Sequence, residues 1–421
     1  MDAFEIQGGT RLRGEMNISG SKNAALPIIA AALLTDEETV IHNVPDLADI
    51  RHLCTLLESL GAKVWRDDKN SLHVKVEDES NCLADYESVR RMRASICVLG
   101  PMLAKRGLAE VSMPGGCAIG DRPIDIHLRG MGALGAKIHL DGGNITAKTD
   151  SLIGDDIFMG GAFGSTVLGT ANIMSAATLA KGTTVIEAAA CEPEITDLGN
   201  FLNSMGAKIT GHGSPRITIK GVETLHGTEH TVIPDRIEAG TFMIAAAITN
   251  GELTLNNCKL EHLMALTDRM KHIGIHVEEI AGQVRVSSAR RLNPVHVVTQ
   301  PYPGFPTDLQ AQLMALLCLA DGNSIITEKI FPDRFMHIAE LNRMGAKLHK
   351  EGATVIVEGV KELIGAPVMA SDLRASAALV LAGMVAKGTT RILRVYHIDR
   401  GYEKIEEKLN AVGANIKRVK E

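Results

Sequence analysis

Hydrophobic and polar positions follow a pattern that recurs six times along the chain. In each recurrence, a segment with helical periodicity ends at a glycine and a short strand-like segment follows. These glycines are Gly61, Gly135, Gly206, Gly274, Gly345 and Gly413, at intervals of 74, 71, 68, 71 and 68 residues. Because glycine adopts the left-handed conformation at a helix end without strain, the pattern predicts six repeats with a helix that stops at this position.

A second pattern runs in phase with the first. Alanine-rich segments precede a turn and a β-branched strand, as in residues 177–189 and 246–257. The longest apolar runs, residues 24–34 and 375–386, are shorter than the ~18 residues that a membrane-spanning helix needs. They are therefore predicted to be buried helices, and each repeat is expected to hold two helices and several strands.

Six repeats divide naturally into three and three. The sequence predicts a first domain over residues 22–231 and a second over residues 232–421, to which residues 1–21 are added. Within that N-terminal segment, Phe4–Ile6 and Arg11–Ile18 alternate in a way that predicts a pair of β-strands. The predicted fold class is α/β with two domains.

Composition limits the partners. The chain of 421 residues has 44 Lys and Arg against 50 Asp and Glu, a net charge of −6, and only 3% aromatic residues. This balance argues against nucleic acid or a membrane surface as a partner. Seven cysteines without a CxxC spacing, and an N-terminus without a signal-peptide pattern, favour the cytoplasm. No grouping of residues predicts a metal site.

The starts of the alanine-rich helices carry polar residues. Ser, Thr or Asp occupies most of the predicted N-cap positions, and the cations nearby are Lys22, Arg93, Arg236 and Arg374. For any single arginine an exposed surface position is the simpler interpretation, but recurrence in several repeats favours a shared role. Because helix N-termini attract anions, we expect an anion-binding cleft between the two domains. The GxGxxG match at residues 130–135 closes a helix instead of opening one, so it does not predict a dinucleotide site.

One loop has the composition of a reactive site. Residues 112–123 contain three glycines and two prolines around Cys117, with Arg122 and His127 nearby. A neighbouring cation lowers the pKa of a thiol and favours the thiolate. We therefore interpret this loop as a mobile lid that carries a reactive cysteine. An incidental loop thiol is the alternative.

These segments together resemble the UDP-N-acetylglucosamine 1-carboxyvinyltransferases, a branch of the enolpyruvyl transferase family, over essentially the whole chain. The motifs that carry the resemblance are Gly20-Ser21-Lys22-Asn23-Ala24, Met92-Arg93-Ala94-Ser95, Pro114-Gly115-Gly116-Cys117, Gly120-Asp121-Arg122-Pro123, residues 305–312, residues 372–376 and residues 396–402. The resemblance implies the inverted α/β barrel of that family, with two domains of three repeats each.

The resemblance also implies an activity. Phosphoenolpyruvate and UDP-N-acetylglucosamine would yield the 3-O-enolpyruvyl sugar nucleotide and phosphate, by addition and elimination through a tetrahedral intermediate. This is the first committed step of peptidoglycan precursor synthesis. No metal or organic cofactor is implied, and the partners are the two small-molecule substrates. The oligomeric state is not implied.

Residue roles are carried over from matching motifs. Cys117 is expected to be the general acid, Asp308 the base for the 3-hydroxyl, and Lys22 a further catalytic residue. The residues expected to bind phosphoenolpyruvate are Lys22, Asn23, Arg122, Arg334, Arg374 and Arg400, with Arg334 and Arg374 on its carboxylate. Those expected to bind UDP-N-acetylglucosamine are Asn23, Arg93, Arg122, Pro123, Ile124, Gly164, Asp308 and Ile330.

Two segments depart from the family pattern. Residues 160–171 differ from the usual Ser-Val-Gly-Ala-Thr loop and lack its lysine, and Pro332-Asp333 replaces Glu-Asn.

Two other functions stay open: an enolpyruvyl transferase with another acceptor, and a non-catalytic sensor of sugar nucleotides. Retention of Cys117, Asp308 and Lys22 argues against the sensor.

Overall fold

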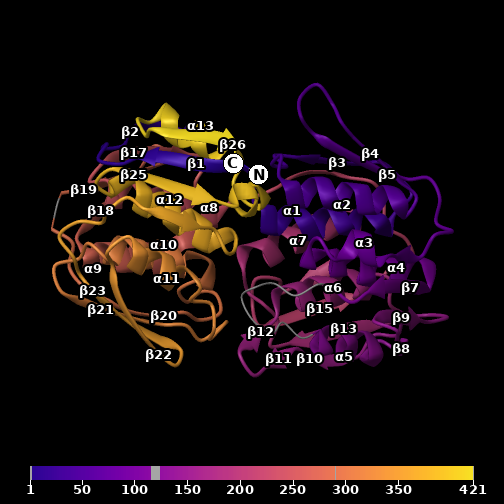
Figure 1. The fold of residues 1–421 in the computed structure, drawn as a ribbon. Coiled ribbons are helices and arrows are strands. Elements are labelled where there is room, and N and C mark those ends of the chain that lie inside the picture. Colours follow the sequence, from indigo (N-terminus) through magenta and orange to yellow (C-terminus); the bar gives the residue numbers. More distant parts are fainter. Residues whose placement is uncertain (1, 115–123, 290, 421) are drawn as a thin grey trace. The chain divides into compact units, whose positions relative to one another are not determined.

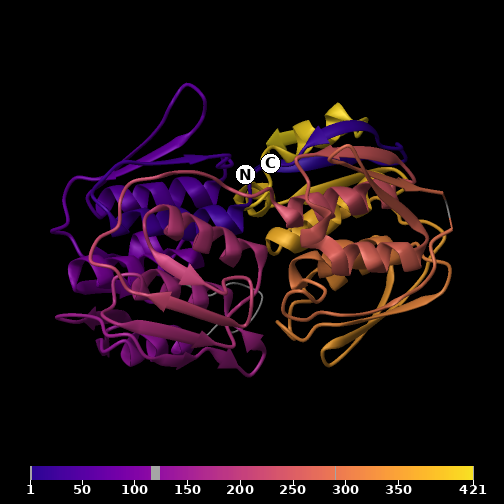
Figure 2. The same cartoon turned by 180° about the vertical axis from the view of Figure 1, so that it is seen from behind.

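The structure is a computed structural model that describes residues 2–114, 124–289 and 291–420. Contacts among these residues divide the chain into two lobes (Figures 1 and 2). The N lobe comprises residues 20–114 and 124–233, and the C lobe comprises residues 2–19 and 234–420. Each lobe encloses a hydrophobic core of its own.

The described part of the N lobe contains three four-stranded sheets, which share one topology. In each, an outer strand pairs in parallel with its neighbour and the other two pairings are antiparallel. The sheets are, in strand order, β16 (Glu229–Thr231), β3 (Thr39–His42), β5 (Leu72–Val76) and β4 (Ala62–Arg66); β6 (Leu83–Ala84), β7 (Leu108–Ser112), β9 (Asn144–Lys148) and β8 (Lys137–Asp141); and β10 (Asp156–Phe158), β13 (Thr183–Glu187), β15 (Arg216–Lys220) and β14 (Lys208–Thr210). A short ribbon pairs β11 (Gly160–Gly161) with β12 (Gly164–Ser165).

Alanine-rich helices fill the interior of the N lobe. The buried helices are α1 (Lys22–Ala31), which continues as η1 (Ala32–Leu34), α4 (Leu99–Arg106), which follows η2 (Arg93–Val98), and α6 (Val167–Ala177). The other helices are α2 (Ala48–Ser59), α3 (Tyr86–Val89), α5 (Asp125–Ala133) and α7 (Pro193–Ser204). In α2 the buried apolar side chains, such as Ile50, Leu53 and Leu57, recur every three to four residues, so one face alone meets the core.

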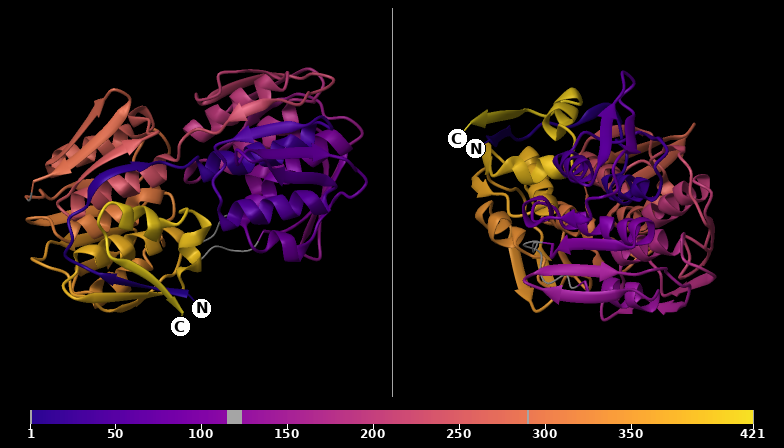
Figure 3. Two further views of the ribbon diagram at one scale, coloured as in Figure 1. Left: turned by 90° about the horizontal axis from the view of Figure 1, so that it is seen from above. Right: turned by 90° about the vertical axis from the view of Figure 1, so that its right-hand side faces the viewer.

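The C lobe repeats this topology in its described residues. Its sheets are, in strand order, β2 (Arg13–Asn17), β17 (Glu252–Asn256), β19 (Gln283–Ser288) and β18 (Ile275–Ile280); β20 (His296–Val298), β21 (Asn323–Thr327), β23 (Thr354–Glu358) and β22 (Lys347–Glu351); and β24 (Pro367–Met369), β25 (Thr389–Leu393), β1 (Asp2–Gln7) and β26 (Ile416–Lys420). The N-terminal strand β1 lies between the C-terminal strands β25 and β26, so the two chain ends lie side by side (Figure 3).

The predicted pairing of the first two strands is wrong. β1 pairs with β25 and β26, whereas β2 pairs in parallel with β17, so the two strands belong to different sheets. The alternation of apolar residues identified both strands correctly. It could not identify their partners, because a period of two fixes which face is buried and not which strand lies alongside.

Three buried helices again form the interior of the C lobe. They are α8 (Arg236–Ile248), α10 (Gln310–Leu317), which follows η4 (Thr307–Leu309), and α12 (Leu373–Val385). Around them lie η3 (Leu260–Leu263), α9 (Met264–Ile273), α11 (His337–Arg343), η5 (Val395–Arg400) and α13 (Ile405–Ala411). In both lobes, helices are thus enclosed by sheets, which is the predicted inverted α/β arrangement (Figure 1).

The local signals behind the repeats are confirmed. All six glycines that were predicted to end a helix have positive φ angles, between 87° and 106°. Four of the inner helices have a side-chain cap, which accepts hydrogen bonds from backbone N–H groups of the first turn. The caps are Ser21 for α1, Thr166 for α6, Asp235 for α8 and Asp372 for α12. The other two inner helices begin with the 3₁₀ turns η2 and η4, whose N-cap residues make no side-chain cap bond. No helix in the described ranges is long and apolar enough to cross a membrane.

Candidate active site

Asp308 lies at the centre of a charged cluster in the C lobe. Its Oδ1 accepts a hydrogen bond from Nη1 of Arg334 at 2.8 Å, and its Oδ2 accepts from Nε and Nη2 of Arg374 at 3.2 and 3.1 Å. These arginines are 26 and 66 residues away in the sequence. The structure therefore brings together three of the residues that the sequence predicted separately.

Both arginines of the cluster are buried. Arg334 is 6% exposed and Arg374 is 1% exposed, whereas the side chain of Asp308 keeps 27% of its surface accessible. A buried cation is strongly destabilising unless an anion and hydrogen bonds compensate it. Burial by itself would lower the pKa of Arg374, but Tyr402 and Asp308 outweigh this and raise the pKa above its ordinary value. The guanidinium of Arg374 thus stays charged.

A polar network surrounds the cluster. The Tyr402 side chain is 1% exposed, and its hydroxyl lies 2.8 Å from Oγ1 of Thr241 and accepts from Nε2 of Gln312 at 3.2 Å. Gln312 also donates to the backbone oxygen of Asp308 at 2.8 Å. The ring of Tyr402 lies 5.3 Å from the guanidinium carbon of Arg374. Contacts from Gln312 and Tyr402 therefore fix the backbone of Asp308 and the position of Arg374.

His337 lies at the start of α11, close enough to Arg334 for the charge of that arginine to act on it. Its side chain is 1% exposed, and burial lowers its pKa to about 4, while Asp372 acts in the opposite direction and Arg334 in the same one. A histidine with this pKa is neutral near pH 7. It therefore adds no positive charge to the arginines that hold Asp308.

The starts of the inner helices meet at one end of the C lobe. Asp308 belongs to η4 and Arg374 to the first turn of α12, and Asp235, the N-cap of α8, acts electrostatically on Arg374. Asp308 is not itself an N-cap, since Pro306 and Leu309 occupy the cap positions of η4 and α10. Two other predicted residues of this lobe, Ile330 and Arg400, are half-buried.

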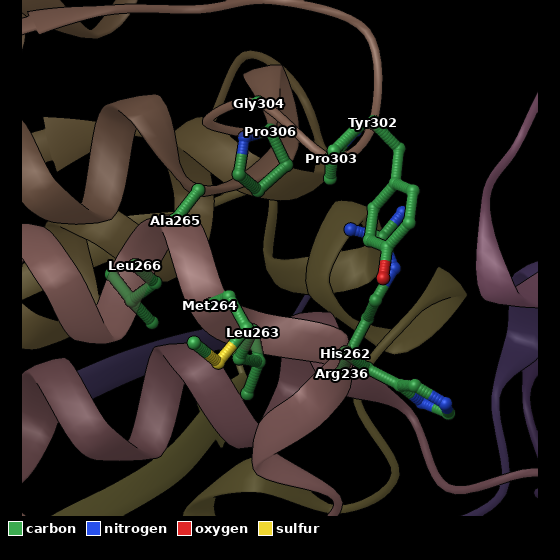
Figure 4. A pocket seen from close by; sticks show the side chains of 10 residues that line it. All are labelled: Arg236, His262, Leu263, Met264, Ala265, Leu266, Tyr302, Pro303, Gly304 and Pro306. Atoms are coloured by element: carbon green, nitrogen blue, oxygen red, sulfur yellow. The ribbon is translucent and has the colours of Figure 1, made fainter.

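Arg236, at the start of α8, contacts an aromatic ring within the C lobe. Its guanidinium lies over the ring of Tyr302, 5.5 Å from the ring centre, at the edge of a hollow in the C lobe. Figure 4 shows this hollow between the loop of Tyr302 and Pro303 and the helical segment of Leu263 and Met264. A guanidinium over an aromatic ring is attracted by it, so this contact stabilises Arg236.

The predicted residues of the N lobe lie at helix starts and in loops. Lys22, in the first turn of α1, is 8% exposed, and its Nζ lies 3.1 Å from Oδ2 of Asp49. Asn23 and Arg93 are half-buried at the starts of α1 and η2. The remaining two predicted residues of this lobe are Ile124, buried just before α5, and Gly164, which lies in β12 with a φ of 103°.

Three predicted residues, Cys117, Arg122 and Pro123, lie outside the residues that the structure describes. The same is true of most of the predicted lid. Within the described ranges, no group of three or more His, Cys, Asp or Glu side chains could hold a metal ion.

Full-length relatives identify the family. The sequence model of the family described as EPSP synthase (3-phosphoshikimate 1-carboxyvinyltransferase) matches residues 6–409. A UDP-N-acetylglucosamine 1-carboxyvinyltransferase of Methylacidiphilum infernorum is 54% identical over 419 residues, which are 100% of this chain and 99% of the relative. The protein of the same name from Geobacter metallireducens is 52% identical and is matched over 100% of both chains. This chain belongs to the UDP-N-acetylglucosamine 1-carboxyvinyltransferase family.

Solved structures agree with this family at the level of the fold. The enolpyruvyl transferase NikO from Streptomyces tendae is 25% identical, covers 99% of both chains and has a TM-score of 0.89. EPSP synthase from Acinetobacter baumannii, at 19% identity and a TM-score of 0.78 over the whole of both chains, shares the fold. The family and the fold predicted from the sequence are thus confirmed.

Several residues that contact the predicted site residues of one lobe or the other, or their hydrogen-bond partners, were missed by the sequence analysis. Asp49, the partner of Lys22, lies among the inward-facing positions of α2, and a charged residue at such a position is a usable signal. Thr241 and Gln312 carry the same signal, because each is a polar residue inside an alanine-rich buried helix. Glu328, which accepts a hydrogen bond from Oγ1 of Thr307 at 2.9 Å, follows the last residue of a strand, where an acidic residue is unremarkable, so nothing distinguished it.

Proposed function

We propose that this enzyme transfers the enolpyruvyl group of phosphoenolpyruvate to the 3-hydroxyl of UDP-N-acetylglucosamine, with release of phosphate. The observation that carries the proposal is the 54% identity, over the whole chain, to a relative with this printed name. The Asp308 cluster supports it, since the reaction needs a carboxylate near cations that can bind an anionic substrate. The transfer is the first committed step of peptidoglycan precursor synthesis, and we propose that it takes place in the cytoplasm.

The chemistry divides into two balanced steps. In the addition, the 3-oxygen of the sugar bonds to C2 of phosphoenolpyruvate, its proton passes to Asp308, and Cys117 donates a proton to C3. In the elimination, a proton leaves C3 for the Cys117 thiolate, the bond from C2 to the phosphate oxygen breaks, and the departing phosphate takes the proton held by Asp308. We assign Asp308 and Cys117 these roles because a carboxylate and a thiol can each exchange a proton at the atom concerned.

The two arginines of the cluster suit a carboxylate ligand. Guanidinium groups bind carboxylates through parallel hydrogen bonds, and Arg334 and Arg374 already bind one, that of Asp308. We propose that the carboxylate of phosphoenolpyruvate takes over part of these bonds. Asp308 would then lose hydrogen bonds to cations and become a better acceptor for the sugar proton.

The remaining roles are proposals from the family. Lys22, Arg122 and Arg400 would neutralise the phosphate, with Asn23 beside it. The sugar nucleotide would contact Asn23, Arg93, Arg122, Pro123, Ile124, Gly164, Asp308 and Ile330. No metal or organic cofactor is proposed. We further propose that residues 22–231, and residues 1–21 with 232–421, are two domains of three repeats each.

A phosphate-release assay with a panel of acceptors tests the proposal. Purified enzyme is incubated with phosphoenolpyruvate and, in turn, UDP-N-acetylglucosamine, 3-phosphoshikimate or no acceptor. We expect release with the sugar nucleotide alone. Release with 3-phosphoshikimate instead would favour another acceptor within the family. Tight binding of the sugar nucleotide without any release would favour the sensor.

A further inference from the structure

Glu328 is a fully buried acidic residue to which the roles above assign nothing. It follows the last residue of β21, has an exposed fraction of 0%, and accepts hydrogen bonds on both carboxylate oxygens. Oε1 accepts from Oγ1 of Thr299 at 2.7 Å and from the backbone N–H groups of Ile330 and Phe331 at 2.8 and 3.0 Å. Oε2 accepts from Oγ1 of Thr307 at 2.9 Å. The carboxylate therefore joins a loop on one side to the residue before Asp308 on the other.

The direction of the hydrogen bonds on the second side is fixed. The Thr307 hydroxyl donates its single proton to Oε2 of Glu328. The oxygen of that hydroxyl then has only lone pairs left, and Nη1 of Arg334 donates to it at 3.1 Å. The same Nη1 donates to Oδ1 of Asp308 at 2.8 Å. Glu328 thus orients an acceptor that helps to hold Arg334 against Asp308.

We propose that Glu328 is a positioning residue for the transfer reaction. Through Thr307 it holds the guanidinium of Arg334 at hydrogen-bonding distance from Asp308. This inference rests on the proposed function, which makes Asp308 and Arg334 part of the reacting site. Within the described residues Glu328 makes no hydrogen bond or ion pair with either residue, and its effect passes through one hydroxyl group. The other oxygen of the same carboxylate, Oε1, accepts from Thr299 and from the amides of residues 330 and 331, and these bonds fix the loop that carries Ile330.

Glu328→Gln separates the effect of the hydrogen bonds to Oε1 from that of the hydrogen bond to Oε2. A glutamine side chain keeps the size of glutamate but offers an acceptor on one side and two donors on the other. Three donors converge on the Oε1 position and only one on the Oε2 position, so the amide oxygen will face Thr299 and the loop. The NH₂ group will then face Thr307 and donate to its hydroxyl oxygen. The hydroxyl proton must then take one of the other two directions on that oxygen, one of which faces Arg334, so the acceptor aimed at Arg334 is no longer fixed.

A double-mutant cycle tests the proposal on the full-length enzyme. Glu328→Gln, Thr307→Val and the double variant are compared for kcat, for the KM of each substrate and for the unfolding midpoint. Because Thr307→Val removes the hydrogen bond to Arg334 and Glu328→Gln leaves that bond without a fixed acceptor, each should lower kcat by ~10–100-fold. The double variant should be no slower than the slower single variant. Thr390→Val is the matched control, since Thr390 is buried in β25 and its hydroxyl has no hydrogen-bond partner within the described residues; it should turn over normally.

Three results would overturn the proposal: normal kcat in Glu328→Gln, multiplicative losses in the double variant, or a loss of stability alone with turnover per folded molecule unchanged. If Glu328→Gln does not fold, normal turnover of Thr307→Val has the same consequence. A crystal structure of Glu328→Gln provides a readout that does not depend on activity. If the unsubstituted enzyme releases no phosphate from the two substrates, the proposed function fails. The contact between Arg334 and Thr307 in that crystal structure still decides the positioning role: loss of the contact supports it, and an unchanged contact overturns it.

Discussion

Arg374 binds Asp308 through two of its guanidinium nitrogens, while its third nitrogen, Nη1, is buried and has no hydrogen-bond partner within the described part of the chain. The side chain is 2% exposed, so this unused donor is not open to bulk water. A buried donor that lacks an acceptor costs ~1–3 kcal/mol. An anionic ligand that reaches Nη1 would remove this cost, which favours binding of a carboxylate at this position.

Arg374→Lys tests this inference. Lysine keeps the positive charge that Asp308 needs, but it cannot bind two oxygen atoms with a planar fork. We expect the KM for phosphoenolpyruvate to rise by at least ~10-fold while the enzyme stays folded. Arg343→Lys is the matched control, because Arg343 lies in α11 with a side chain that is 63% exposed. Equal KM values for the two variants would contradict a carboxylate site at Arg374.

Asp308→Asn tests the assignment of the base. Asparagine keeps the size of the side chain and an oxygen that can accept from one arginine, but it cannot take up the proton of the sugar hydroxyl. Turnover should fall by ~10²–10⁴-fold, while affinity for UDP-N-acetylglucosamine stays close to that of the unsubstituted enzyme. Both quantities are measured on one preparation of the variant. Near-normal turnover would leave Asp308 as a structural partner of the two arginines and the base unassigned.

Selective labelling tests the role of Cys117. Burial raises the pKa of Cys54 to about 11 and those of Cys97, Cys258 and Cys318 to about 12, so these thiols stay protonated near neutral pH. The thiolate is the reactive form. We expect a small phosphonate epoxide, which resembles phosphoenolpyruvate, to alkylate Cys117 first. Peptide mapping after brief exposure measures this, and equal labelling of Cys54, Cys82 or Cys258 would contradict selective activation.

His73 predicts a pH-dependent stability that the only tryptophan can report. Its Nδ1 lies 2.7 Å from Oε1 of Glu38 and its Nε2 lies 3.4 Å from Oδ2 of Asp67. Burial acts to lower the pKa of His73, but these two carboxylates outweigh it, so the pKa is raised. The ring of Trp65 stacks on that of His73 with centres 4.9 Å apart. Trp65 emission should therefore change as His73 titrates.

The sign of the stability effect follows from the raised pKa. The stabilisation by protonated His73 is fully present below the ordinary histidine pKa of ~6.5 and is lost as the pH rises through the higher pKa of the folded state. His73→Gln should therefore reduce the free energy of unfolding more at low pH than at high pH, as measured by urea denaturation. His276→Gln, at an exposed position of β18, is the control. A loss that is equal at both pH values would contradict the charged interaction.

The fold could largely be predicted from the sequence because its signals are local. A helix end at Gly61 or Gly345 and a cap at Asp235 or Asp372 each depend on a few neighbouring residues. The pairing of β1 with β26 joins the two ends of the chain, and no local pattern encodes it. The domain assignment, the site roles and the behaviour of the Cys117 loop stay predictions.

The site could be predicted only as separate residues. Motifs gave Asp308, Arg334 and Arg374 individually, but the hydrogen bonds among them depend on how three segments pack. Glu328 was not found, because its importance comes from burial and from four converging donors, neither of which the sequence displays. Polar residues within buried helices, such as Gln312, are the signal that would have extended the prediction.

The most direct test of the central claim is identification of the reaction product. Enzyme, phosphoenolpyruvate and UDP-N-acetylglucosamine are incubated together, and the sugar nucleotide is analysed by mass spectrometry and NMR while phosphate is measured in the same sample. Enolpyruvyl transfer predicts one phosphate released for each sugar nucleotide that gains an enolpyruvyl ether at its 3-oxygen. Unmodified sugar nucleotide, with or without conversion of phosphoenolpyruvate to pyruvate and phosphate, would contradict it.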